Sequence, residues 1–160
     1  MFVDSTNSCD AENHTITFFL TPCAAGAVPL GIVITKGQTE LAYTAGFKLL
    51  KNSLDKPFNR NGSPTIFMTD NSSAEINSLC SIWPGCENLL CIFHVGQNVW
   101  WWLWESKHCT LKGHRAILMG LFQKILYASR LEEAANEYLN AQACISAYLP
   151  IYENWREYVS

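Results

Sequence analysis

Residues 65–70 read Thr-Ile-Phe-Met-Thr-Asp, and residues 89–94 read Leu-Leu-Cys-Ile-Phe-His. Each stretch is a short apolar run of the length of a buried strand. The sequence Ser-Ser-Ala-Glu over 72–75 is a capping box that opens a helix after the first run, and a tryptophan-rich helix follows the second. The order strand, helix, strand, helix is typical of parallel β/α units, so these two stretches decide an α/β fold.

An antiparallel hairpin is expected before these units, because two apolar, β-branched runs flank the turn-prone segment from Pro22 to Gly26. Residues 1–3 look like the end of a first strand whose beginning is cut short and which stops at Asp4. Everything after Lys112 has helical periodicity. The predicted fold is therefore a mixed five-stranded sheet flanked by helices, with an all-helical C-terminal third. The five expected strands span residues 1–4, 15–21, 28–35, 65–69 and 89–93.

Composition bounds the class of protein. The chain has 160 residues, of which 49% are hydrophobic and 16% charged, so a single folded domain over 1–160 is expected, with a β/α part at 1–111 and a helical part at 112–160. The net charge of −3 gives no global attraction to DNA. Seven irregularly spaced cysteines and no secretory signal favour a reducing, intracellular location. Prolines interrupt the uncharged stretch 13–35, so no membrane partner is expected.

Asp4 and Asp70 each follow a short predicted strand. Because the carboxyl ends of neighbouring parallel strands lie side by side, the two aspartates are candidates for a shared divalent metal. Two such metals would clamp the attacking and leaving oxygens of a phosphodiester. The alternative is structural: Asp70 begins a turn and Asp4 lies in a frayed terminus.

Cys91 and His94 are spaced so that both side chains can reach one zinc ion. The structural alternative is a cysteine buried in a strand and a histidine at the start of the next helix. The tryptophans at 100, 101, 102 and 104 suggest either base stacking or, because the segment is apolar nearly all round, a buried helix. The basic residues at 48, 51, 56, 60, 107, 112 and 115 line a phosphate path or solvate a face.

The order of these motifs resembles the transposases of Mutator-like elements (MULEs). The match consists of Asp4-Ser-Thr6, Thr69-Asp70 followed by Ala74, the pair Cys91 and His94, and an acidic helical segment around Glu133. The resemblance implies a ribonuclease-H-like sheet with a triad of two aspartates and a glutamate. Such a triad would bind two Mg²⁺ or Mn²⁺ ions, cut DNA at element ends and join it to a target, in the nucleus.

By motif, Asp4 and Asp70 are the first two acids and Glu133 the third, with Glu132 and Glu137 as alternatives. Helical geometry places Glu132 and Glu133 about 100° apart, and the stripe 131, 135 and 138 is expected to be the packed face. The DNA-recognition region of the family is expected outside this chain, which would be a catalytic-core fragment. Two alternative functions stay open: a non-catalytic, domesticated DNA- or protein-binding module, and a small zinc-binding domain on Cys91 and His94. Self-association of the chain also stays open.

Overall fold

The computed structural model describes residues 1–55, 58, 60 and 62–160. It is an α/β fold with a five-stranded mixed sheet and a helical C-terminal part, which confirms the predicted fold class. The chain divides into two compact units, residues 1–91 and 92–160. Lys56, one of the basic residues considered for a phosphate path, lies outside the described residues.

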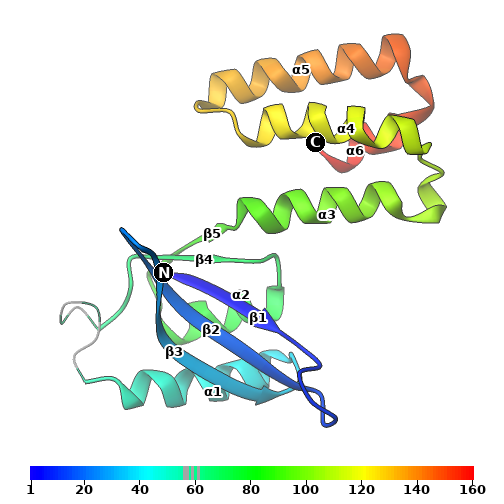
Figure 1. Ribbon diagram of the computed structural model, residues 1–160. Coiled ribbons are helices and arrows are strands. Elements are labelled where there is room, and N and C mark those ends of the chain that lie inside the picture. Colours follow the sequence, from blue (N-terminus) through cyan, green and yellow to red (C-terminus); the bar gives the residue numbers. More distant parts are fainter. Residues whose placement is uncertain (56–57, 59, 61) are drawn as a thin grey trace. The chain divides into compact units, whose positions relative to one another are not determined.

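The first unit contains the whole sheet, whose strand order is β3-β2-β1-β4-β5 (Figure 1). β1 pairs antiparallel with β2 and parallel with β4, so it joins the hairpin to the parallel part. β2 and β3 form the hairpin, and β4 and β5 run parallel. The elements are β1 (Phe2–Thr6), β2 (His14–Cys23), β3 (Gly26–Lys36), α1 (Glu40–Ser53), β4 (Ile66–Thr69), α2 (Ser73–Ile82) and β5 (Glu87–Leu90).

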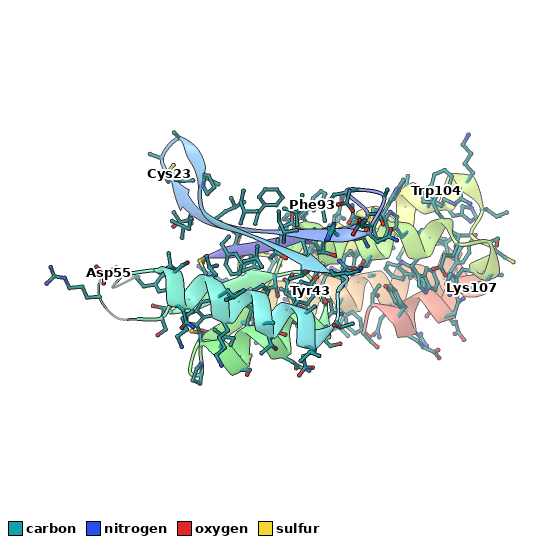
Figure 2. The ribbon with its side chains drawn as sticks, turned by 90° about the horizontal axis from the view of Figure 1, so that it is seen from below. Cys23, Tyr43, Asp55, Phe93, Trp104 and Lys107 are labelled. Carbon is teal, nitrogen blue, oxygen red and sulfur yellow. The ribbon has the colours of Figure 1, made fainter. Side chains whose placement is uncertain are left out.

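The hairpin strands are longer than the sequence predicted. Figure 2 shows Cys23 at the hairpin tip, where β2 ends, and β3 begins again at Gly26. Gly26 has φ +125°, a backbone conformation that favours glycine. The register shifts between Phe19 and Leu20, opposite Pro29, because a proline has no N–H to give to a regular ladder.

One face of the sheet packs on α1 and α2. Its strands contribute Val3, Phe19 and Phe67 to a buried cluster, and the helices contribute partners such as Phe47, whose ring meets the Phe19 ring edge-on at 5.2 Å. Figure 2 shows Tyr43 of α1 under the strands. On the opposite face Ile32 and Ile34 of β3 are exposed. The two helices therefore fix which side of each strand is interior.

The last strand is displaced from its predicted position. β5 covers Glu87–Leu90 instead of 89–93, because the second unit begins with a helix at Ile92 and takes Ile92 and Phe93 out of the sheet. Glu87 instead extends the parallel ladder beside Ile66. Cys91 is thus a linking residue between strand and helix, and the prediction that it lies within a strand is wrong.

The second unit is helical. Its core gathers Leu103, Leu118 and Ile145 from three helices together with Tyr152 and Trp155 from the C-terminal segment. None of the helices in the described part of the chain combines the length and the apolar character needed to cross a bilayer. The elements are α3 (Ile92–Trp104), η1 (Ser106–His108), α4 (Lys112–Leu126), α5 (Leu131–Tyr148), η2 (Pro150–Tyr152) and α6 (Glu153–Tyr158).

Two predictions about buried helix faces are wrong. Leu131 of α5 is 89% exposed, whereas Ala141 and Ile145 are buried, because the returning C-terminal segment covers the second half of this helix. In α3 Trp102 is buried and stacks on His108 at 3.7 Å, but Trp101 is 57% exposed. α3 packs through one side only, so it is not a helix buried all round.

The contact between α1 and β3 gives a stability test. A Cβ added at Gly46 would lie 2.5 Å from Val33 Cγ1 and 3.0 Å from Thr35 Cγ2, so Gly46→Ala is expected to destabilise the first unit by about 1–3 kcal/mol. Gly120→Ala in α4 is the control, because a Cβ there meets nothing within 4 Å and should stabilise the helix by about 1 kcal/mol. Denaturant unfolding followed by circular dichroism measures both; equal effects would contradict the packing of α1 on β3.

Candidate functional site

Asp4 of β1 and Asp70, the residue after β4, belong to neighbouring segments of the sheet. β1 and β4 run parallel with Phe2 opposite Met68. Asp4 comes two residues further along β1, and Asp70 comes two residues after Met68, directly after the end of β4. Adjacent strands are about 4.8 Å apart, so the two residues start from neighbouring backbone positions. The parallel pairing that the sequence suggested therefore brings these two aspartates to the same edge of the sheet.

The sequence predicted that Asp4 ends its strand, and this prediction is wrong. Asp4 lies in the middle of β1. The strand continues through Ser5 to Thr6, which pairs with Ile16 of β2. The long hairpin supplies a partner for these two residues, so the ladder extends past the aspartate. Asp4 is exposed, while its neighbours Val3 and Ser5 face the side of the sheet that the helices cover. A position inside a ladder holds the Asp4 backbone firmly.

Asp70 opens α2 as well as lying beside Asp4. Its Oδ1 accepts a hydrogen bond from the Ser72 backbone N–H at 2.8 Å, and the Thr69 hydroxyl donates to its carbonyl oxygen at 2.9 Å. This is the turn geometry in which an aspartate satisfies a backbone donor two residues on. The structural interpretation of Asp70 is therefore correct, and it coexists with the position beside Asp4.

A third carboxyl, which the sequence assigned only to helix capping, lies close to the same edge. Glu75 of α2 is 1% exposed, and the Ser5 hydroxyl donates to its Oε2 at 2.5 Å. In the expected capping box Glu75 would accept from the Ser72 N–H, but Asp70 already occupies that donor. Ser72 itself still caps the helix by accepting from the Glu75 N–H at 3.4 Å. Asp70, two residues before the capping serine, is the sequence feature that could have indicated this: it takes the Ser72 N–H, so Glu75 does not complete the capping box.

Glu75 has a raised pKa, to which both aspartates contribute. Burial raises the pKa of Glu75 from 4.5 to about 7; the hydrogen bond from Ser5 opposes the rise, and the charges of Asp70 and Asp4 add to it. Its Oε1 is buried and has no hydrogen-bond partner among the described residues. Glu75 is thus a carboxyl group whose pKa is about 7 and which interacts electrostatically with both aspartates.

The donor set suits a hard divalent cation. Mg²⁺ in proteins commonly takes one or two carboxylates and completes its shell with waters and substrate phosphates. Within residues 1–55, 58, 60 and 62–160, no three His, Cys, Asp or Glu side chains are grouped as ready metal ligands. Asp4 on β1 and Asp70 directly after β4 are therefore candidates only for this more open kind of site, in which the protein supplies two carboxylates.

Cys91 lies at the same sheet edge as Asp70. Its backbone N–H donates to the Thr69 carbonyl at 2.7 Å, which continues the parallel pairing of β4 and β5 by one step. The side chain is half-buried, and all seven cysteines are free thiols. His94 belongs to the first turn of α3, as expected, and meets the Phe93 ring at 5.4 Å.

A comparison with protein families now bears on these residues. The family model for the MULE transposase domain matches residues 2–98, more than half of the chain. The chain belongs to the MULE transposase family. No curated protein is similar enough to this chain to count as a relative. The matched part of this MULE transposase domain includes Asp4, Asp70, Glu75, Cys91 and His94.

Glu133, the predicted third acid, lies outside residues 2–98, which match the MULE transposase domain. It is exposed in the first turn of α5, where its Oε2 accepts from the Ser129 N–H at 2.9 Å. With Glu132 and Glu137 it lines a surface hollow of about 410 Å³. The expectation that only one of Glu132 and Glu133 can face a given site does not apply to this hollow, because both line it.

Three of the basic residues considered for a phosphate path have partners within the chain. Lys51 donates to the Ile82 carbonyl at 2.6 Å and so caps the end of α2. Lys107 forms an ion pair with Glu105 at 2.5 Å, and the Arg115 guanidinium lies 4.0 Å from the Trp104 ring. These three cations have roles in the fold, so they do not by themselves define a phosphate path.

The raised pKa of Glu75 predicts a pH-dependent stability. The native state holds the Glu75 proton more tightly than the unfolded state, so stability falls as the pH rises from 4.5 through 7, by about 3 kcal/mol in total. Glu75→Gln removes this contribution and should exceed the parent in stability at pH 8 while matching it near pH 4.5. Urea unfolding at both pH values measures the difference.

Glu40→Gln is the matched control, because Glu40 is also in the first turn of a helix but is exposed. It should leave the pH profile of the parent unchanged. If the stability of Glu75→Gln depends on pH in the same way as that of the parent, the pKa of Glu75 is not raised in the native state.

Proposed function

We propose that this chain is the catalytic core of a DNA transposase with a ribonuclease-H-like sheet and a divalent-cation site at Asp4 and Asp70. The observation that carries the proposal is the parallel pairing of β1 with β4, with Phe2 opposite Met68, which supports a position of Asp4 beside Asp70 at one edge of the sheet. Membership of the MULE transposase family supports a transposase-related role. Three antiparallel strands followed by two parallel ones agree with the proposed fold.

In this proposal the carboxylates of Asp4 and Asp70 bind the cations and orient them toward the scissile phosphate. Bound cations would activate the attacking oxygen and stabilise the leaving oxygen of an in-line displacement. The ladder fixes the backbone of Asp4, and the hydrogen bond from the Ser72 N–H fixes the Asp70 carboxylate. The reactions would be cleavage at element ends and strand transfer to target DNA.

DNA is the proposed partner, and the nucleus the proposed location. The net charge of −3 means that affinity for DNA must come from local contacts or from sequence-reading regions other than this core. Self-association stays a prediction, as does the part of Cys91 and His94 in the family motif.

Cation binding tests the proposal directly. Isothermal titration of the parent chain with Mn²⁺ should give saturable binding, and Asp4→Asn and Asp70→Asn should each weaken it at least tenfold, because each removes a charged ligand. Asp55→Asn is the control, since Figure 2 shows Asp55 projecting from the loop after α1.

Two outcomes would favour the alternatives. Absence of saturable Mn²⁺ binding would favour a non-catalytic DNA- or protein-binding module. Tight zinc binding that Cys91→Ser and His94→Ala abolish would favour a small zinc-binding domain.

The third acid of the proposed triad has its own test. By the family motif, Glu133→Gln should lose tight Mn²⁺ binding while the chain stays folded. Glu132→Gln and Glu137→Gln are the comparison variants, because all three glutamates line the same hollow. Unchanged binding in Glu133→Gln with a loss in one of the others would move the assignment to that residue.

Mn²⁺-dependent nicking of a supercoiled plasmid tests catalysis itself. Nicking by the parent that Asp4→Asn and Asp70→Asn both abolish would support a strand-cleaving core. Nicking that survives both substitutions would come from another source and contradict the proposed site.

A further inference from the structure

A chain of buried hydroxyl groups connects Glu75 to the strand that carries Asp4. The Ser5 hydroxyl donates to Glu75 Oε2 at 2.5 Å and lies 2.8 Å from the Thr17 hydroxyl. Since Ser5 gives its proton to Glu75, it accepts from Thr17. Thr17 is fully buried, and it stands opposite Ser5 in the β1–β2 ladder. Glu75 therefore holds Ser5, the residue directly after Asp4, from behind the sheet.

The fold alone gives no reason for a carboxyl at this position. Glu75 is 1% exposed, its Oε1 has no hydrogen-bond partner, and no Lys or Arg of the described residues forms an ion pair with it. A buried polar atom without a partner destabilises the native state. A glutamine could accept the same bond from Ser5 without a charge. An ionisable group kept there, beside two further acids, points to a positive ligand at the edge of the sheet.

The charges that act on Glu75 from Asp4 and Asp70 are negative, and no Lys or Arg in the described part of the chain forms an ion pair with it. Asp4 acts on it from β1 and Asp70 from the end of β4. Tyr43 of α1 is neutral at physiological pH, since burial raises the pKa of Tyr43 above its ordinary value of 10 and the charge of Glu75 adds to the rise. The mutual repulsion of three carboxylates is unfavourable, and a bound divalent cation would offset it.

We propose that Glu75 is a positioning residue of the cation site: through Ser5 it fixes the part of β1 that carries Asp4, and its charge strengthens the binding of a divalent cation by Asp4 and Asp70. The proposal rests on the proposed function. It places Glu75 behind the ligands, so it requires no direct bond from Glu75 to the metal. Groups that orient metal ligands commonly contribute 10- to 100-fold in affinity.

The test combines Mn²⁺ titration calorimetry with urea unfolding on the full chain. At pH 8, Glu75→Gln should bind Mn²⁺ about tenfold more weakly than the parent and yet be at least as stable. Ser5→Ala, which removes the connecting hydroxyl, should also weaken Mn²⁺ binding. Glu40→Gln should change neither quantity. If Glu75 had a purely structural role, Glu75→Gln would not lower the affinity for Mn²⁺ and at the same time preserve the stability of the chain.

Three outcomes would overturn the proposal, and they are distinguishable. If Glu75→Gln binds Mn²⁺ like the parent while Asp4→Asn does not bind it, Glu75 has no part in the site and the proposed function stands. If Glu75→Gln loses stability together with affinity, its role is structural. If the parent shows no saturable Mn²⁺ binding, the proposed cation site fails, and the role of Glu75 fails with it.

Discussion

The parallel pairing of β1 with β4 is the constraint on which the arrangement of the acids depends. β1 is hydrogen-bonded on both sides, to β2 in the hairpin and to β4 in the parallel part. A shift of this register by one residue would turn Asp4 to the covered side of the sheet and Ser5 to the open side. The core residue Val3 opposes that shift, because its side chain would leave the buried cluster with Phe19 and Phe67. Apolar packing thus sets the positions of the polar groups.

The carboxyl groups of Asp4, Asp70 and Glu75 affect the stability of the domain and the proposed binding of a cation in opposite directions. Three carboxyl groups close together repel one another, and the buried one has its pKa raised to about 7. Such a group lowers the stability of the domain at neutral pH. The hydrogen bonds from Ser5 to Glu75 and from Ser72 to Asp70 offset part of this cost and fix the geometry. In the proposed cation site, a bound divalent ion would supply the compensating positive charge.

The second unit follows a simpler physical logic. Its helices bury one side each around Leu103, Leu118 and Ile145, and Tyr152 and Trp155 complete the core from the C-terminal segment. The Tyr152 hydroxyl also accepts from the Leu111 N–H at 3.1 Å, which satisfies a donor at the start of α4. Trp100, Trp101 and Trp104 stay partly exposed on α3, so its tryptophans do not form a single buried stripe.

The sequence by itself determined the kinds of elements, the family and two of the three acids at the sheet edge. Short apolar runs, a capping serine and a hairpin pattern act over a few residues, so local rules predict them, and Asp4 and Asp70 stand in motifs that are legible in one dimension. Only the tertiary structure decided where β1 and β5 end, which half of α5 is covered, and that Glu75 is buried beside Ser5. The reason is that strand ends, helix coverage and burial depend on partners distant in the chain. Glu75 and Ser5 are 70 residues apart, and no local pattern records a hydrogen bond across that separation.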